Sequence, residues 1–233
     1  MSEHRPALPH GALEEVFEDV FFVTGTTRPS FQGLDWQYSR SMTVVREGDA
    51  LTLINTVRLD EEGLAALDAL GSVEHVVKLG AFHGIDDAFY VDRYGAAQWG
   101  LEGAEHFAGH SSDRLLGDDV PFTGARVFRF ECGPPEGLIV IERDGGVLVS
   151  CDALQNWTDV DAFFDEASAQ RMRQFGFIAP ANIGPGWRQA ASPQKSDLLP
   201  VLELEFQHLL PAHGTPIRGD AREQLTRTIE AFA

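Results

Sequence analysis

The order in which strands and helices are expected along this chain is the feature that most constrains its fold. A β-hairpin is expected over residues 41–55, where two runs rich in β-branched residues flank an acidic-Gly-Asp turn at residues 47–49. A helix over residues 59–70 and a strand over residues 73–79 follow, and strands and then helices recur in the second half. This order predicts an α/β fold with two central sheets and helices outside them, rather than a doubly wound parallel sheet.

The spacing of apolar residues and the positions of turn residues predict the remaining helices, strands and loops. Asp60 is expected to cap the helix over residues 59–70, because Leu64, Leu67 and Leu70 share one helical face behind it. No interior linker divides the chain, so we expect a single domain over residues 1–233. Further strands are expected over residues 20–24, 125–131, 137–142, 146–150 and 207–210, further helices over 86–94, 160–175, 197–205 and 222–232, and loops over 25–40, 100–121 and 178–192.

The charge of the chain argues against two classes of partner. The chain has 18 Lys and Arg residues against 36 Asp and Glu residues, a formal net charge of −18, with no basic cluster along the sequence. Nucleic acids and anionic membranes bind proteins with the opposite balance, so neither is expected as a partner. A small-molecule ligand or substrate is expected instead, and the oligomeric state is left open.

Cysteine usage and the N-terminal segment predict the compartment. Cys132 and Cys151 lack disulfide-scaffold or metal-ligand spacing and are expected to be reduced thiols. The N-terminal segment has no positive region ahead of its apolar stretch, and the apolar runs are far shorter than the ~20 residues that span a bilayer. We therefore expect a cytoplasmic protein.

Histidine or aspartate side chains directly follow three of the expected strands. These residues are His83, Asp86 and Asp87 after the strand over 73–79, Asp152 after the strand over 146–150, and His213 after the strand over 207–210. Side chains at the ends of neighbouring strands converge, and imidazole with carboxylate suits a divalent metal ion. Motifs for nucleotide binding (G-x-G-x-x-G, G-x-x-x-x-G-K-[ST]) and for a serine nucleophile (G-x-S-x-G) are absent.

At these strand ends the chain resembles the metallo-β-lactamase superfamily. The segment LLPAHGTPI (residues 209–217) looks like the family's last-histidine motif, and GGVLVSCDAL (residues 145–154) looks like its strand with the metal-bridging aspartate. The resemblance runs from residue 21 to the C-terminal helix. It implies a four-layer αββα sandwich of two mixed β-sheets with helices on the outside and a site at one edge between the halves.

The chain departs from the family's metal-binding signature, H-x-H-x-D-H. The matching segment is His83-Gly84-Ile85-Asp86-Asp87-Ala88, which keeps the first histidine and the aspartate but has Ile85 and Ala88 in place of two histidines. A shift of one residue would make Asp86 the matching aspartate. The family's middle histidine should fall in residues 131–137, where only Cys132 or Glu136 could substitute.

The resemblance therefore implies a reduced metal site. Four ligands are too few for the family's two-ion site but could hold one divalent ion, zinc, iron or manganese, with an open position for water. Asp86 is the candidate catalytic proton acceptor, or an outer partner of the ligands. The implied ligands are His83, Asp87, Asp152 and His213, and the implied substrate-binding residues are Trp157, His106 and His110.

Two functions are compatible with this pattern. The first is a metal-dependent hydrolase that acts on an ester, amide, thioester or phosphoester bond. The alternative is a catalytically inactive member of the superfamily that binds a small ligand or a protein partner without metal. In the alternative, the buried carboxylates need other partners, such as backbone N–H groups or an arginine.

Overall fold

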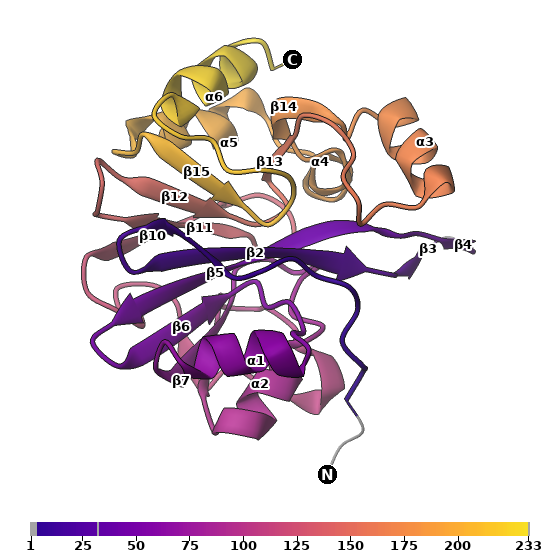
Figure 1. Ribbon diagram of the computed structural model, residues 1–233. Helices are drawn as coiled ribbons and strands as arrows, with labels where there is room; N and C mark the ends of the chain where they lie inside the picture. The colour runs from indigo at the N-terminus through magenta and orange to yellow at the C-terminus, as the bar shows by residue number, and fades with distance from the viewer. Residues whose placement is uncertain (1–3, 32, 233) are drawn as a thin grey trace.

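Two β-sheets lie face to face in the computed structural model, which describes residues 4–31 and 33–232, and helices cover both outer faces (Figure 1). The larger sheet has the order β1 (Glu14–Phe17), β2 (Val20–Thr27), β5 (Tyr38–Glu47), β6 (Ala50–Ile54), β7 (Ser72–Lys78), β8 (Ala97–Gly100) and β9 (Arg114–Leu115). The smaller sheet has the order β10 (Ala125–Arg129), β11 (Gly137–Ile141), β12 (Val147–Ser150) and β15 (His208–Pro211). Two short pairs complete the strands: β3 (Ser30–Phe31) with β4 (Leu34–Asp35), and β13 (Leu154–Trp157) with β14 (Ala179–Ile183).

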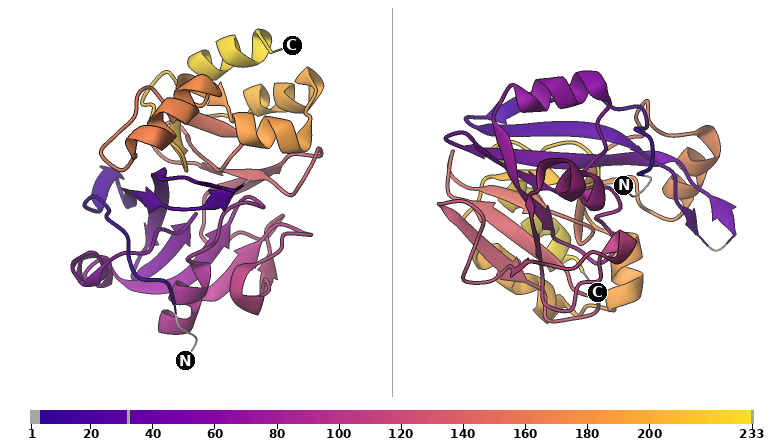
Figure 2. Two further views of the ribbon diagram at one scale, coloured as in Figure 1. Left: turned by 90° about the vertical axis from the view of Figure 1, so that its right-hand side faces the viewer. Right: turned by 90° about the horizontal axis from the view of Figure 1, so that it is seen from below.

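The helices divide between the two outer layers. The layer on the larger sheet holds α1 (Glu61–Asp68) and α2 (Asp87–Tyr94), and a 3₁₀ turn, η1 (Phe107–Gly109), follows later in the chain. The other layer holds α3 (Glu166–Gln174), α4 (Pro185–Ala191), α5 (Lys195–Leu198), η2 (Leu199–Glu203) and α6 (Ala221–Glu230). Figure 2 shows the two ends of the chain on opposite outer layers. The expected four-layer αββα sandwich is confirmed. Among the described residues, no helix has the length and apolarity to cross a bilayer.

Three apolar clusters fill the spaces between the layers. Leu67 and Tyr90 pack between α1, α2 and the larger sheet. Val77 and Ile139 belong to the cluster between the two sheets, and Trp187 belongs to the cluster under the other helical layer. The inner strands β6, β11 and β12 are therefore buried on both faces, which explains their nearly continuous apolar sequences, whereas the outer strands β1, β9 and β10 are partly exposed.

The strand ends that carry the candidate residues meet at one edge of the sandwich. Strands β6, β7 and β8 are parallel, and so are β12 and β15, so the chain leaves them at the same edge. Backbone hydrogen bonds join the two sheets there: Gly137 N–H donates to the Leu79 carbonyl at 2.8 Å, and Ser41 N–H donates to the Ala212 carbonyl at 2.7 Å. The loops after β7, β12 and β15 are therefore held against one another.

The opening of the chain agrees with its sequence pattern. Strands β5 and β6 pair as the expected antiparallel hairpin. Asp60 caps α1, and its carboxylate accepts a hydrogen bond from Gly63 N–H at 2.9 Å. The helix expected after residue 86 is α2, which ends at Gly95 in the left-handed conformation with φ 68°.

Several expected segments were wrong in extent or type, and the loop expected over residues 100–121 contains η1 and β9. The loop expected over residues 25–40 contains the end of β2, all of β3 and β4, and the start of β5. The connector expected over residues 178–192 contains β14 and α4, because Pro185 occupies the first helical turn, where its missing N–H costs nothing. The helix expected over residues 160–175 begins only at Glu166, and the one expected over 197–205 begins at Lys195 and tightens to η2 from Leu199.

Asp165 sets the start of α3, which yields a stability prediction. Its carboxylate accepts a hydrogen bond from Ser168 N–H at 2.6 Å. An alanine there leaves the first turn without its cap, so Asp165→Ala is expected to lower the free energy of unfolding by about 1 kcal/mol in urea titrations. An unchanged unfolding midpoint would show that the cap does not stabilise α3.

Candidate metal centre

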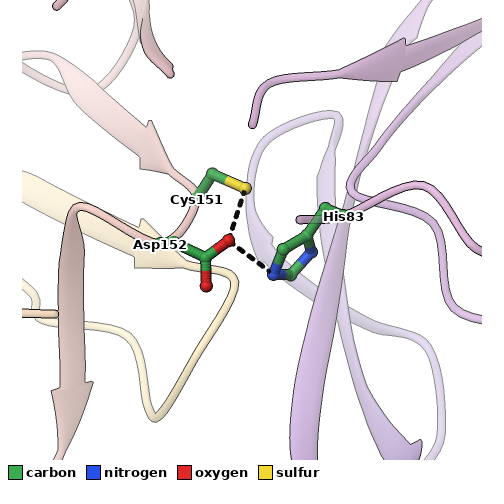
Figure 3. Close-up of side chains that lie close together, drawn as sticks. All are labelled: His83, Cys151 and Asp152. Atoms are coloured by element: carbon green, nitrogen blue, oxygen red, sulfur yellow. Dashed lines mark hydrogen bonds and ion pairs between the residues drawn. The ribbon is translucent and has the colours of Figure 1, made fainter. Parts of the chain in front are cut away.

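His83, Asp152 and His213 come together from three different loops at the edge of the sandwich. The Nε2 atoms of His83 and His213 lie 3.0 Å apart. The Asp152 carboxylate contacts both rings, with Oδ1 at 3.2 Å from His213 Nε2 and Oδ2 at 3.4 Å from His83 Nε2. Figure 3 shows the His83 ring and the Asp152 carboxylate directed at one another from facing loops. The structure therefore brings together three of the four ligands that the sequence predicts.

Neighbouring groups fix the orientation of His213. Its Nδ1 lies 3.2 Å from the Ser39 carbonyl, which can only accept, so Nδ1 carries the proton and a neutral ring presents the Nε2 lone pair to the cluster. The Trp157 ring packs on the imidazole with centroids 4.7 Å apart, and its Nε1–H donates to Ser39 Oγ at 2.8 Å. Trp157, predicted to line the substrate site, thus lies directly against the cluster.

The protonation states match those of metal ligands. Burial by itself raises the pKa of Asp152, but the electrostatic effect of the adjacent His83 and His213 imidazoles outweighs it and brings this pKa far below its ordinary value. Burial lowers the pKa of His213, and the Asp152 carboxylate offsets this only in part. An ionised carboxylate and a neutral imidazole are the forms that bind divalent ions.

Cys151 is a member of the cluster that sequence reasoning did not assign as a ligand. Its Sγ lies 3.7 Å from Asp152 Oδ2, and the donor atoms of His83, Cys151 and Asp152 lie within 4.8 Å of one another (Figure 3). Burial, and then the neighbouring Glu136 carboxylate, raise the pKa of this thiol well above its usual value. The signal that could have found Cys151 is its place directly before Asp152 at the end of β12.

Glu136 lies on the far side of Cys151 and is 1% exposed. Its Oε1 accepts from Ala153 N–H at 2.7 Å, while its Oε2 is buried with no hydrogen-bond partner among the described residues. Burial raises the pKa of this carboxyl well above its usual value. Gly80 permits the arrangement, because a Cβ there would lie 2.2 Å from Glu136 Oε2 and 2.6 Å from Cys151 Sγ. Cys132, the other possible substitute for the missing histidine, packs instead against the outer core cluster.

Asp87, the fourth predicted ligand, directs its carboxylate to other partners. Oδ1 accepts from the Thr56 hydroxyl, and Oδ2 accepts from the Gln98 amide at 3.3 Å. Burial raises the pKa of Asp87, and these hydrogen bonds and the charge of Lys78 oppose the rise. No contact recorded among the described residues joins Asp87 to the group of His83, Asp152 and His213.

Asp86, the predicted proton acceptor, forms a buried ion pair with Arg40. Arg40 Nη2 donates to Asp86 Oδ2, and Arg58 N–H donates to the same oxygen at 2.8 Å. The side chains of Asp86 and Arg40 are 7% and 8% exposed. Both contacts therefore engage one carboxylate oxygen, Oδ2, with protein donors.

His106 and His110, predicted to bind substrate, lie in the loop after β8. His106 Nε2 lies 2.7 Å from the Ser112 hydroxyl, and His110 Nε2 lies 3.7 Å from an Asp92 carboxylate oxygen. Both line a shallow cavity with Leu101 and Leu115, and neither makes a recorded contact with His83, Asp152 or His213 in the described part of the chain. Their role in substrate binding stays a prediction.

Several solved structures of metallo-β-lactamases resemble this chain. They include FIM-1 from Pseudomonas aeruginosa in its mono-zinc form, at 13% identity over 96% of both chains with a TM-score of 0.63. DIM-1 matches at 14% identity over 97% of this chain and 98% of its own, with a TM-score of 0.64. An enzyme from Hirschia baltica matches at 14% identity over 94% and 97%, with a TM-score of 0.61. No family model and no curated protein matches the chain. Nearly complete coverage in both directions, together with the sheet order and the strand-end residues, shows that this chain has the metallo-β-lactamase fold.

Proposed function

We propose that this protein is a metal-dependent hydrolase that binds one divalent ion through His83, Asp152 and His213. The observation that carries the proposal is the mutual approach of three side chains: the two Nε2 atoms lie 3.0 Å apart, and the Asp152 carboxylate lies 3.2 Å from one of them through Oδ1 and 3.4 Å from the other through Oδ2. Ligands about 2.0–2.2 Å from a tetrahedral ion lie roughly 3.3–3.6 Å from one another. The donors therefore need only small adjustments to share zinc, iron or manganese.

The donor set supports one ion rather than two. Asp87, which the resemblance assigns as a ligand, is engaged by Thr56 and Gln98, and Ile85 and Ala88 stand where the family has histidines. Three protein ligands leave a position open for water and substrate, as catalytic zinc sites require. A mono-zinc form is also described for FIM-1, a protein of the same fold.

The chemistry of the site follows from its residues. A divalent ion held there would supply Lewis acidity, which polarises the bond to be cleaved and favours ionisation of water. Asp152 contributes the negative charge, the Ser39 carbonyl holds the His213 ring, and Trp157 supplies an apolar wall. We propose a small molecule with an ester, amide, thioester or phosphoester bond as the substrate, and a cytoplasmic location for the enzyme.

The proposal is tested by assaying purified protein against chromogenic substrates of these four bond types. We expect hydrolysis of at least one substrate, loss of that activity after chelation, and recovery when about one equivalent of zinc, iron or manganese is added. Activity that survives removal of metal would contradict the proposal.

Metal-free ligand binding is the competing function, and one observation favours it. Asp86 and Asp87, two of the carboxylates near the site, already have protein partners, Arg40 and Arg58 for the first and Thr56 and Gln98 for the second. In that case His213→Ala would leave metal content and thermal stability nearly unchanged. Removal of metal from the wild type is compared with removal from His213→Ala. A drop of several degrees in the wild-type melting temperature, which added metal restores in the wild type but not in the variant, would support the hydrolase, because a bound ion stabilises the folded state.

Cys151 provides a further prediction about the ligand set. The thiolate is the metal-binding form of cysteine, and burial raises the pKa of this thiol, so the neutral side chain is a weak donor. We therefore expect Cys151→Ala to retain at least about half of the wild-type metal content, measured by mass spectrometry of metals. Loss of metal equal to that in His213→Ala would instead make Cys151 a required ligand.

A further inference from the structure

Four arginines gather around one cavity on the outer side of the loop that carries His83. The cavity has a volume of about 190 Å³, roughly six times the ~30 Å³ share of a liquid water molecule. Asp86 is the only carboxylate among its lining residues. The arginines are Arg5, Arg28, Arg40 and Arg58, which come from the N-terminal segment, the residue after β2, β5 and the loop before α1.

Two of these arginines are fixed in place by the fold. The Arg40 side chain is 8% exposed and is held by the Asp86 carboxylate. The Arg58 guanidinium lies over the Phe89 ring, 3.3 Å from its centroid, and donates from Nη1 to the Leu59 carbonyl. Such a guanidinium is pre-organised, so little conformational entropy is lost when it binds a ligand.

The same two arginines have unused donors. The Nε atoms of Arg40 and Arg58 are buried and have no hydrogen-bond partner among the described residues. A buried donor without a partner costs free energy, and a charged one costs more. An anion in the cavity that both arginines line would offset that cost.

The other two arginines leave the cavity with excess positive charge. Arg28 donates from Nε to the Gln37 amide oxygen, and neither Arg28 nor Arg5 pairs with a carboxylate in the part of the chain that the structure describes. Four guanidinium groups against Asp86 give a local charge of 4 − 1 = +3. Such a cluster of arginines is unusual in a chain with 36 acidic and only 18 basic residues. The four positive charges repel one another unless an anion lies between them.

We propose that this cavity binds a phosphate group, either free phosphate or the phosphate of a small monoester. The planar guanidinium fork matches the spacing of phosphate oxygens and binds them with paired hydrogen bonds. A dianion balances an excess of three positive charges better than a single carboxylate does. The proposal goes beyond the proposed hydrolytic function and does not rest on it, since none of the lining residues is a proposed metal ligand.

The test measures phosphate binding to the full chain by isothermal titration calorimetry. Metal is first removed by chelation and dialysis, so that the result is independent of the proposed metal site, and Tris buffer at constant ionic strength avoids competing anions. The probes are inorganic phosphate, glycerol phosphate and acetate. The variants are Arg58→Gln, Arg28→Gln, and Arg227→Gln on α6 as the matched control, since Arg227 is an exposed arginine remote from the cavity.

We expect saturable one-to-one binding of phosphate or glycerol phosphate by the wild type. Arg58→Gln should weaken it about tenfold, exposed Arg28→Gln about threefold, and Arg227→Gln less than about twofold. Tighter binding of glycerol phosphate indicates a monoester ligand, and tighter binding of inorganic phosphate indicates free phosphate. Absence of saturable binding, equal affinity for acetate, or equal affinity in Arg28→Gln and Arg227→Gln would overturn the proposal. Arg28→Gln keeps the test decisive if Arg58→Gln fails to fold.

Discussion

Asp152→Asn is expected to lower bound metal from about one ion per chain to below about one-tenth, and to slow hydrolysis at least ~100-fold. Asp152 is the only carboxylate that contacts both His83 and His213 among the described residues, with one oxygen on each ring. Asparagine keeps the size of the side chain but removes the charge that balances a divalent ion. Bound metal is measured by mass spectrometry, and hydrolysis with the substrate found in the assay above.

Two further variants make this result specific. His213→Ala should give the same loss of metal, because it removes a donor from the same group. Asp159→Asn serves as the matched control, because the Asp159 side chain is 76% exposed and, among the described residues, pairs only with exposed Arg173 and a neighbouring backbone amide. Asp152→Asn that keeps wild-type metal content would contradict the assigned ligand set.

Asp86→Ala is expected to destabilise the protein by about 3–5 kcal/mol, which is the cost of leaving one partner of a buried ion pair alone. The pair with Arg40 is almost fully buried, and Asp86 also accepts from Arg58 N–H at 2.8 Å. The loss is measured by urea unfolding. Glu142→Ala is the matched control, since the pair of Glu142 with Arg126 is 48% and 54% exposed and should contribute between about 0 and 1 kcal/mol.

The same position tests the predicted role of Asp86 in proton transfer. If Asp86 acts only by holding Arg40 and the loop, the isosteric Asp86→Asn variant should keep hydrolysis within about tenfold of wild type and leave its pH profile unchanged. A folded Asp86→Asn variant that loses the acidic limb of the pH profile would instead identify Asp86 as the proton acceptor.

The order of strands and helices predicted two central sheets with helices outside them, and the resemblance to the metallo-β-lactamase superfamily implied the four-layer sandwich. Three members of the candidate metal centre were predicted from local signals. Buried strands that end in His83, Asp152 or His213 can be recognised from their apolar runs, and parallel strands deliver such residues to one edge. The hairpin over residues 41–55 and the Asp60 cap depend on turn and capping residues that act within a few positions.

Side-chain direction and long-range partners could not be predicted in this way. Asp86 and Asp87 are adjacent at the start of α2, yet one reaches Arg40 and the other reaches Thr56 and Gln98. The choice depends on residues far away in the sequence. The arginine-lined cavity was missed for the same reason, because its arginines are scattered from residue 5 to residue 58 and form a cluster only in the folded chain.

The most direct test of the account is the metal content of the wild-type protein purified without chelator. Quantitative mass spectrometry should find about one equivalent of zinc, iron or manganese per chain, because His83, Asp152 and His213 provide three donors with 3.0–3.4 Å separations. Less than about one-tenth of an equivalent of all three metals together, with no uptake when they are added back, would contradict the proposed metal centre.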